Sequence, residues 1–268
     1  MWEKREKNGL IYYTLPAWEK AGAKVVATTR FGGVSKAPCC GLNLGLHVDD
    51  NADDVVENRR LMLDAMGSSA EDFVTLKQVH GKRILKADAS YRGRGFASYD
   101  DAVDDTDGVF TAETHVLMAT FYADCLPLAV FHPEKKILGL AHAGWKGTYQ
   151  NIGGELMAAM RETADFDPEE CWCALGAGIG SCCYEVDDSF YRRFCERYDM
   201  AEEWFTHKDG AFYFDNVKAN IALFMKNGVK KENIEVLDLC TACHNDMFFS
   251  YRKEHGQTGR HGLWGELI

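Results

Sequence analysis

Long apolar runs are missing from this sequence. No stretch approaches the roughly 20 consecutive apolar residues that a membrane-spanning helix needs. The first seven residues are mostly charged and lack the apolar core of a secretory signal peptide. We therefore expect a soluble, cytoplasmic protein with no membrane partner.

An excess of positive charge is also missing. The chain of 268 residues carries 30 Lys and Arg against 41 Asp and Glu, for a net charge of −11. This balance argues against nucleic acid as a partner. Because 46% of the residues are hydrophobic and 12% are aromatic, the chain can bury a sizeable core and is not expected to be disordered.

Disulfide bonds are not expected, although the chain has ten cysteines. Without an export signal, cysteines stay reduced and behave mostly as small apolar residues. The adjacent pairs Cys39-Cys40 and Cys182-Cys183 are therefore expected to be free thiols.

Residues 240–244, Cys-Thr-Ala-Cys-His, have the spacing of a c-type haem attachment motif. Haem attachment requires export, and no βαβ pattern surrounds Cys240 and Cys243 that would indicate a thioredoxin-like role. We expect both thiols to be reduced and free of haem.

Strand-like and helix-like segments follow one another without strict alternation, which favours an α+β fold over a doubly wound sheet. No internal repeat or low-complexity linker interrupts the chain, so residues 1–268 are expected to form a single domain. Strands are expected at residues 24–29, 73–78, 116–123, 126–132 and 137–142, with a hairpin turn at 132–136 and a surface loop at 93–107. Helices are expected from the N-cap Asn51 to Gly67, over residues 147–163, and from the N-cap Asp215 to Gly228.

Three short motifs contain the ligand types that zinc prefers. His80 lies in Gln-Val-His-Gly, Cys125 in Tyr-Ala-Asp-Cys, and His142 in Ala-His-Ala-Gly-Trp. Two imidazoles and a thiolate leave one position of a tetrahedral ion open, as in catalytic zinc sites. Each residue alone could equally be a buried core residue, but together they indicate a metal site. Because Cys125 and His142 fall at the ends of neighbouring strands, we expect them to face each other.

These and other motifs resemble the YfiH-like family, whose members have been described as laccase-domain proteins or polyphenol oxidases and also as purine nucleoside phosphorylases. The matching segments run from residue 28 to residue 260 and cover almost the whole chain. They are residues 28–35, 42–48, 57–59, 78–81, 123–127, 142–147, 248–252 and 258–260.

The resemblance implies a four-layer α/β/β/α sandwich with mixed sheets and a zinc ion held by His80, Cys125 and His142. It also implies phosphorolysis of adenosine, inosine, guanosine and methylthioadenosine, with adenosine deamination as a second activity. The partners would be a small-molecule nucleoside and phosphate. The matching motifs add Asn43 to the substrate-binding candidates.

The chain departs from the family pattern at two positions. Lys146 stands where the family often has Arg, and Asp49 stands where it commonly has Gly. Lysine keeps the positive charge but lacks the planar guanidinium that binds phosphate or carboxylate through two hydrogen bonds.

The two reactions need different groups. A bound zinc ion makes hydroxide available at neutral pH, and zinc deaminases use a separate carboxylate to carry the proton. Asp124 is the nearest carboxylate to Cys125 in the sequence and is a catalytic candidate. Adjacent strand residues point to opposite faces, so a structural role is the alternative. Phosphorolysis needs an anion pocket, for which the candidates are Arg30 beside the Gly32-Gly33 turn, Lys146, Arg252 and Arg260.

Multi-copper chemistry is a weaker interpretation. Coupled copper centres need many closely spaced histidines, and this chain has nine His and no His-x-His. A set of two histidines and one cysteine could still hold a single Cu²⁺, because copper binds more tightly than most divalent metals.

Two other classes of function are compatible with the same residues. Cys125 could be a nucleophile with His142 or His80 as its base, in a hydrolase or amidase acting on a cell-wall precursor. A zinc-stabilised binding module is the non-enzymatic alternative, and it would need a fourth ligand, for which His47 is the candidate. The sequence leaves the oligomeric state open.

Overall fold

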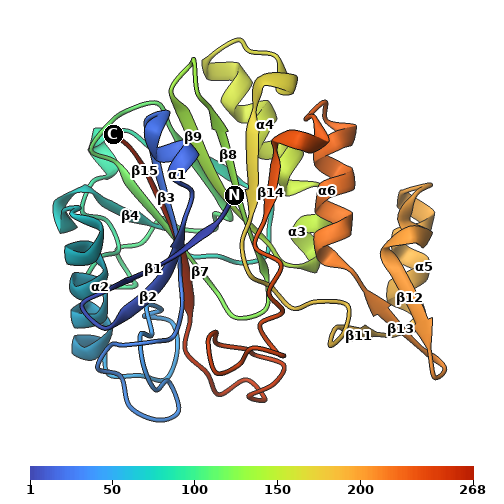
Figure 1. The fold of residues 1–268 in the computed structure, drawn as a ribbon, viewed down its shortest axis with the longest axis horizontal. Helices are drawn as coiled ribbons and strands as arrows, with labels where there is room; N and C mark the ends of the chain where they lie inside the picture. Colours follow the sequence, from blue (N-terminus) through green and yellow to red (C-terminus); the bar gives the residue numbers. More distant parts are fainter.

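Two six-stranded mixed sheets lie face to face in the computed structural model, which describes all 268 residues (Figure 1). Helix α2 (Ala52–Met66) packs on the outer face of the first sheet. Helices α4 (Ile152–Thr163) and α6 (Asn216–Lys226) pack on the outer face of the second. The expected four-layer α/β/β/α arrangement of an α+β fold is confirmed.

The first sheet places the C-terminal strand near its centre, between two strands from the N-terminal half of the chain. All neighbours in it are antiparallel except β4 and β7, which are parallel. In spatial order its strands are β1 (Glu3–Lys7), β2 (Leu10–Thr14), β3 (Ala23–Thr28), β15 (His261–Leu267), β7 (Leu117–Tyr122) and β4 (Phe73–Thr75).

The second sheet is built around one antiparallel hairpin whose two strands are buried along their whole length. Leu126 lies opposite Ala143 and His132 opposite Ile137, so the expected turn at residues 132–136 is confirmed. In spatial order the strands are β14 (Ile234–Val236), β10 (Trp172–Leu175), β8 (Leu126–His132), β9 (Ile137–Ala143), β6 (Gly108–Thr111) and β5 (Ile84–Lys86).

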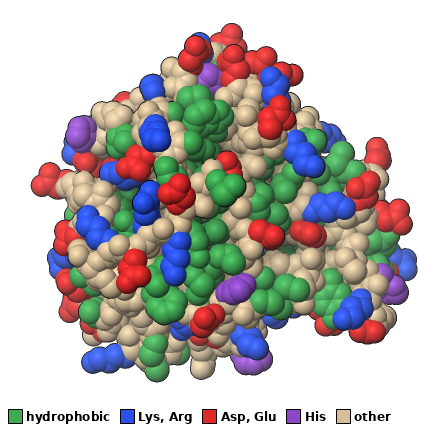
Figure 2. Space-filling view, in the orientation of Figure 1, with side chains coloured by type: hydrophobic (Ala, Val, Ile, Leu, Met, Phe, Trp, Pro, Cys, Tyr) green, Lys and Arg blue, Asp and Glu red, His purple; other side chains and the backbone are tan.

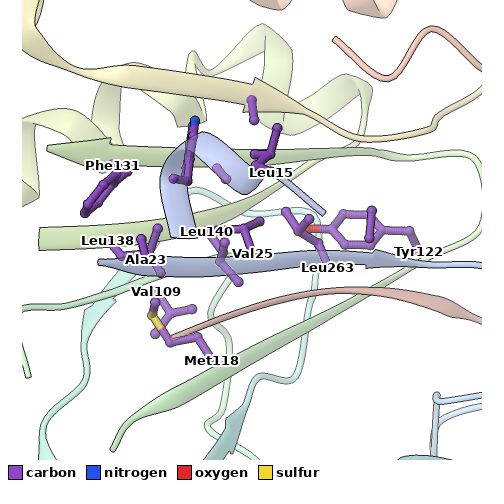
Figure 3. Packing of buried hydrophobic residues seen from close by; sticks show 14 of the residues in the cluster. Leu15, Ala23, Val25, Val109, Met118, Tyr122, Phe131, Leu138, Leu140 and Leu263 are labelled. Carbon is purple, nitrogen blue, oxygen red and sulfur yellow. The ribbon is translucent and has the colours of Figure 1, made fainter. Parts of the chain in front are cut away.

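Strand β8 is apolar on both faces because each face packs against a different layer. Ala129 and Phe131 belong to the core between the two sheets, whereas Leu128 and Val130 belong to the core beneath α4 and α6. Successive strand residues point to opposite sides, so one continuous apolar run supplies both layers. Figure 3 shows the inter-sheet core, in which Phe131 and its labelled neighbours fill the space between strands of the two sheets.

Helix α2 begins and ends as its sequence predicts. The Asn51 side chain accepts hydrogen bonds from the N–H groups of Asp53 and Asp54, and Gly67 adopts a left-handed φ of 71° at the C-cap. Helix α6 is likewise capped by Asp215, whose carboxylate accepts from the N–H of Lys218.

Two expected elements differ in the structure. The helix expected over residues 147–163 is divided into α3 (Trp145–Tyr149) and α4, because Asn151 adopts a left-handed φ of 57°. Its side chain then caps α4 by accepting from the N–H of Gly154. Strand β4 ends at Thr75 rather than residue 78, so His80 lies in irregular chain beyond it.

A small lobe projects from one side of the two sheets, at the right of Figure 1. Its own apolar cluster includes Phe194, Trp204 and Phe214. The lobe contains β11 (Glu185–Val186), α5 (Asp188–Arg197), β12 (Phe205–Lys208) and β13 (Ala211–Phe214). The remaining helices are α1 (Pro16–Lys20) and short 3₁₀ turns at Ala70–Asp72, Ala89–Tyr91, Pro168–Glu170, Ala201–Trp204 and Lys231–Asn233.

Acidic and basic side chains are interspersed over the face of the molecule in Figure 2, and no continuous basic surface is visible on it. None of the helices has the length and apolarity that crossing a bilayer would require.

Candidate active site

The three expected ligand residues meet where the chain passes from one sheet to the other. Strand β7 of the first sheet ends at Tyr122 and β8 of the second begins at Leu126, so Cys125 lies on a three-residue crossover. His142 is near the end of β9, opposite Pro127 of β8. The expectation that Cys125 and His142 lie at facing strand ends is confirmed.

The ligand atoms of this group are close enough to share one ion. One ring nitrogen of His80, one of His142 and the Sγ of Cys125 all lie within 4.8 Å of one another. Sγ of Cys125 is 3.7 Å from Nε2 of His80, and the two imidazole centroids are 4.7 Å apart. The chain thus brings together donors that are far apart in the sequence.

A buried carboxylate that sequence reasoning missed organises this group. Asp107 has no exposed surface, and it accepts hydrogen bonds from the N–H groups of Val79 (3.1 Å), His80 (2.9 Å) and Gly81 (2.7 Å). Its Oδ1 is also 2.8 Å from Nδ1 of His142. A single side chain therefore fixes the loop that carries one ligand and the ring of another.

Asp107 had no distinguishing signal in the sequence. It closes the acidic segment expected to be a surface loop, and it is one of several aspartates there. Burial raises the pKa of its carboxyl, but the hydrogen bond and charge of His142 outweigh this and keep the pKa below its usual value. The carboxylate therefore stays charged beside the ring that it holds.

The Cys125 thiol and the His142 ring shift each other's protonation. Burial raises the pKa of Cys125, but the neighbouring His142 lowers it further, and the net pKa is below its usual value. Burial lowers the pKa of His142, but the Cys125 thiolate and Asp107 raise it above its usual value. The arrangement favours a thiolate beside an imidazolium when no metal is bound.

A cavity of about 390 Å³ opens beside these three residues. Its wall combines aromatic rings with two guanidinium groups, which suits a flat aromatic ligand together with an anion. The aromatic residues in the wall are Phe121, Tyr122, Trp145, Tyr184 and Tyr251, and the cations are Arg252 and Arg260.

The two arginines are held in different ways. Arg260 is partly buried, and its Nη1 donates to the carbonyl oxygens of Thr258 and Gly259, each at 2.9 Å. Arg252 is exposed, and its Nη1 makes longer contacts with the carbonyl oxygens of Cys183 (3.4 Å) and Glu185 (3.3 Å). Arg260 is therefore the more firmly oriented cation of the wall.

The Asp124 carboxylate also borders the cavity, but both of its oxygens already accept hydrogen bonds. Oδ1 accepts from the hydroxyl of Thr241 and Oδ2 from the N–H of Arg252, each at 2.6 Å. The residue has a left-handed φ of 85°, which an aspartate tolerates better than most side chains. These contacts join the crossover loop to the C-terminal segment, and a part in proton transfer stays a prediction.

Three other candidates, Arg30, Lys146 and Asn43, are not among the residues that line the cavity. Arg30 is paired with Glu254 at 3.0 Å and lies over the Phe249 ring. Lys146 is exposed, with its Nζ over the ring of Trp145. Contact of these side chains with substrate stays a prediction.

Asn43, also outside the wall, acts on the site through a neighbour. It is fully buried, and its Oδ1 accepts from the N–H of Arg260 at 2.8 Å. Its Nδ2 donates to Asp50 at 2.7 Å. His47 lines the cavity but is not part of the group whose ligand atoms lie within 4.8 Å of one another. The group of three therefore matches an open site better than a closed four-ligand site.

Comparison with known proteins gives one consistent result. The family model described as multi-copper polyphenol oxidoreductase laccase matches residues 24–264. The purine nucleoside phosphorylase YlmD of Geobacillus stearothermophilus is 38% identical over 244 residues, which are 90% of this chain and 88% of that protein. The purine nucleoside phosphorylase of Deinococcus radiodurans is 39% identical over 243 residues, 90% of this chain and 87% of that protein.

Solved structures show the same similarity. The hypothetical protein YfiH of Bacillus licheniformis superposes with a TM-score of 0.93 at 32% identity, over 99% of each chain. The YlmD structure from Geobacillus stearothermophilus gives a TM-score of 0.92 at 35% identity, over 98% of this chain and 97% of that one.

Proposed function

Because the chain belongs to the laccase-like family that includes YfiH and YlmD, we propose that it is a zinc-dependent purine nucleoside phosphorylase. Its substrates are a small-molecule nucleoside (adenosine, inosine, guanosine or methylthioadenosine) and phosphate, and adenosine deamination is a second activity. The observation that carries the proposal is the group of His80, Cys125 and His142 beside a cavity walled by aromatic rings and two arginines.

The donor set fits a zinc ion. In a tetrahedral site with Zn–N of about 2.0 Å and Zn–S of about 2.3 Å, ligand atoms are separated by about 3.3–3.8 Å. The distance of 3.7 Å between Sγ of Cys125 and Nε2 of His80 lies in that range. Nδ1 of His142 is engaged by Asp107, which leaves Nε2 as its metal-binding atom.

When bound by these three residues, zinc supplies a Lewis acid with one open coordination position. Asp107 keeps the His142 ring in one tautomer and one orientation. The family description and the donor set also allow a single copper ion in the same place. Metal analysis separates the two.

In phosphorolysis, an oxygen of phosphate forms a bond to the anomeric carbon of the ribose while the bond from that carbon to the purine nitrogen breaks. The products are ribose 1-phosphate and the free base, which takes up a proton. We propose that Arg260 and Arg252, both in the cavity wall, hold the phosphate dianion by charge-assisted hydrogen bonds. The rings of Tyr184 and Tyr251, in the same wall, are the proposed contacts of the nucleoside.

Deamination replaces the 6-amino group of adenosine with oxygen from water and releases ammonia. A proton must move from the attacking water to the leaving nitrogen. Asp124 is the candidate carrier, because each of its oxygens accepts only one hydrogen bond, from Thr241 or Arg252, and keeps a lone pair for a proton.

A cysteine hydrolase or amidase is the second candidate function, and one observation favours it. The half-buried Sγ of Cys125 lies within 4.8 Å of a ring nitrogen of His142, and this proximity lowers the pKa of the thiol and raises that of the imidazole, as in a nucleophilic pair. Such an enzyme would need no metal, and amides such as a cell-wall precursor would be its substrates.

The decisive experiment is metal analysis of the purified protein combined with identification of the products from adenosine, with and without phosphate. We expect bound zinc, adenine plus ribose 1-phosphate when phosphate is present, and inosine as the product of the second activity. Conversion that persists unchanged in rigorously metal-free protein would contradict the zinc mechanism and favour the cysteine hydrolase.

A further inference from the structure

Four cysteine sulfurs from two distant segments meet beside the active-site cavity. Cys182 and Cys183 lie in the turn between β10 and β11, and Cys240 and Cys243 lie in the turn that follows β14. The four Sγ atoms all lie within 4.8 Å of one another. Sγ of Cys243 is 3.4 Å from that of Cys182 and 3.5 Å from that of Cys183.

We propose that these four thiolates form a second metal site, a closed tetrahedral site for a structural Zn²⁺. The edge of a ZnS₄ tetrahedron with Zn–S bonds of about 2.3 Å is about 3.8 Å, close to the 3.4 Å and 3.5 Å separations present here. A sulfur-only donor set excludes Mg²⁺ and Ca²⁺, which take oxygen ligands, and is typical of structural zinc. The C-x-x-C spacing of residues 240–243 thus belongs to a metal site rather than to haem attachment.

Backbone hydrogen bonds hold the two turns together independently of an ion. The N–H of Thr241 donates to the carbonyl oxygen of Gly178 at 3.0 Å, and the N–H of Gly180 donates to Sγ of Cys240 at 3.2 Å. The hydrogen bond from the Gly180 N–H to the sulfur stabilises Cys240 as a thiolate ligand. A Cβ at Gly180 would lie 3.3 Å from Sγ of Cys182 and 3.2 Å from Cβ of Cys240. Glycine at this position therefore lets the two turns approach closely enough for the sulfurs to converge.

A cation beside the site offsets its charge. Four thiolates and one Zn²⁺ carry two negative charges in total, so a positive neighbour stabilises the group. The Arg252 guanidinium donates to the carbonyl oxygens of Cys183 and Glu185, at the edge of the cysteine turn. No carboxylate belongs to the group of four.

The position of the site gives it a role in shaping the cavity. Tyr184 follows Cys183 directly and lines the cavity, as does Arg252. Thr241, between Cys240 and Cys243, donates its hydroxyl to Asp124 on the loop that carries Cys125. A zinc ion here would join the two segments that form one wall of the cavity, so its loss would loosen nucleoside binding.

The test uses a protein from which the first metal site has been removed. In the variant His80→Ala, Cys125→Ser, His142→Ala we expect about one equivalent of zinc per chain, held by four sulfurs in zinc-edge X-ray absorption. Adding Cys240→Ser and Cys243→Ser should reduce this to near zero. The matched control adds Cys40→Ser and Cys195→Ser, which lie outside both groups, and should keep the zinc.

Should the cysteine variant fold poorly, Co²⁺ reconstitution of the first variant answers the same question, because four thiolates give Co²⁺ an intense tetrahedral absorption spectrum. Zinc bound through nitrogen or oxygen, zinc unaffected by the Cys240 and Cys243 substitutions, or a disulfide among the four cysteines in the protein isolated under reducing conditions would overturn the proposal. Failure of the proposed catalytic function would leave this result unchanged, since the variant lacks the catalytic donors.

Discussion

The carboxylate of Asp107 holds the ring of His142 through a hydrogen bond of 2.8 Å, and both groups are buried. The same carboxylate accepts three backbone N–H groups from the loop that carries His80. One residue therefore sets the position of two of the three proposed ligands, although it contributes no ligand atom itself.

The first prediction is that Asp107→Asn weakens zinc binding, although Asp107 supplies no ligand atom. An amide group keeps the size of the side chain but places an NH₂ where only N–H donors now point. We expect zinc affinity to fall about 10–100-fold, as for other groups that orient metal-binding histidines. Stability should fall by about 1–3 kcal/mol because buried donors lose their acceptor. Chelator competition and chemical denaturation measure the two effects.

Asp104→Asn is the matched control, because Asp104 belongs to the same loop but is largely exposed and pairs with Lys77. The effect of Asp104→Asn on zinc affinity and on the free energy of unfolding should be small. Equal effects of the two substitutions would show that Asp107 has no special part in the metal site.

The second prediction concerns Cys125→Ser. A hydroxyl is a poor ligand for zinc, so metal affinity and activity should fall together, with partial recovery at high added zinc because His80 and His142 remain. Chelation should inactivate the wild-type enzyme reversibly, and bound zinc should protect Cys125 from alkylation. Cys195→Ser, on α5, is the control. Alkylation of Cys125 that proceeds equally with and without zinc would argue that the thiol is not a ligand.

Much of the fold was predictable because local signals and tertiary packing agree. The Asn51 cap, the β8–β9 hairpin and the three ligand motifs each depend on a few consecutive residues. The break between α3 and α4 was not predictable, because a left-handed Asn151 interrupts a segment whose apolar spacing suits one continuous helix.

The residues around the ligands were harder to find, because their roles arise from contacts between distant segments. Asp107 resembles its acidic neighbours until the fold buries it, and Asp124 meets Thr241 only across 117 residues of chain. Two adjacent cysteines and a C-x-x-C motif look like unrelated free thiols until the turns that carry them meet.

The third prediction separates two roles of Asp124. Both of its oxygens accept hydrogen bonds in this structure, so we expect it to act mainly by positioning the loop before Cys125. Asp124→Asn and Thr241→Val should then lower kcat/KM for phosphorolysis and deamination to a similar extent, about tenfold for a loss of about 1.4 kcal/mol. Steady-state kinetics and pH–rate profiles of both reactions are the measurement.

Thr206→Val, at an exposed position of β12, serves as the control for a threonine-to-valine change. A proton carrier would behave differently: Asp124→Asn would then lower deamination alone by about 10²–10⁴-fold, while Thr241→Val would leave most of it. That pattern would establish Asp124 as a catalytic residue.

The fourth prediction assigns the phosphate to Arg260. Its guanidinium is oriented by two carbonyl oxygens and lies in the cavity wall. Arg260→Gln should raise the KM for phosphate roughly 10–100-fold, the effect of losing one charge-assisted hydrogen bond of about 1.5–3 kcal/mol. Arg260→Lys should recover part of the loss, because the charge remains without the fork. The exposed Arg60→Gln on α2 is the control. An unchanged phosphate KM in Arg260→Gln would place the anion elsewhere.

The last prediction concerns acid stability and the buried His261 of β15. This ring is 2% exposed and packs between Tyr122 and Phe248. Burial and the nearby Arg260 lower its pKa to about 3. In the unfolded chain the ring takes up a proton below a pKa of about 6.5, so the folded state loses stability as the pH falls from there towards 3.

The size of this effect follows from the same two pKa values. At pH 5 the loss attributable to His261 is about 2 kcal/mol relative to pH 8. The variant His261→Phe cannot take up this proton. Between pH 8 and pH 5, the free energy of unfolding of the variant should therefore fall by about 2 kcal/mol less than that of the wild type. Urea denaturation of both proteins at a series of pH values measures the difference. His207→Phe makes the same change at an exposed position of β12 and should leave the wild-type pH dependence in place. Parallel pH profiles for wild type and His261→Phe would mean that the buried ring does not carry the acid sensitivity.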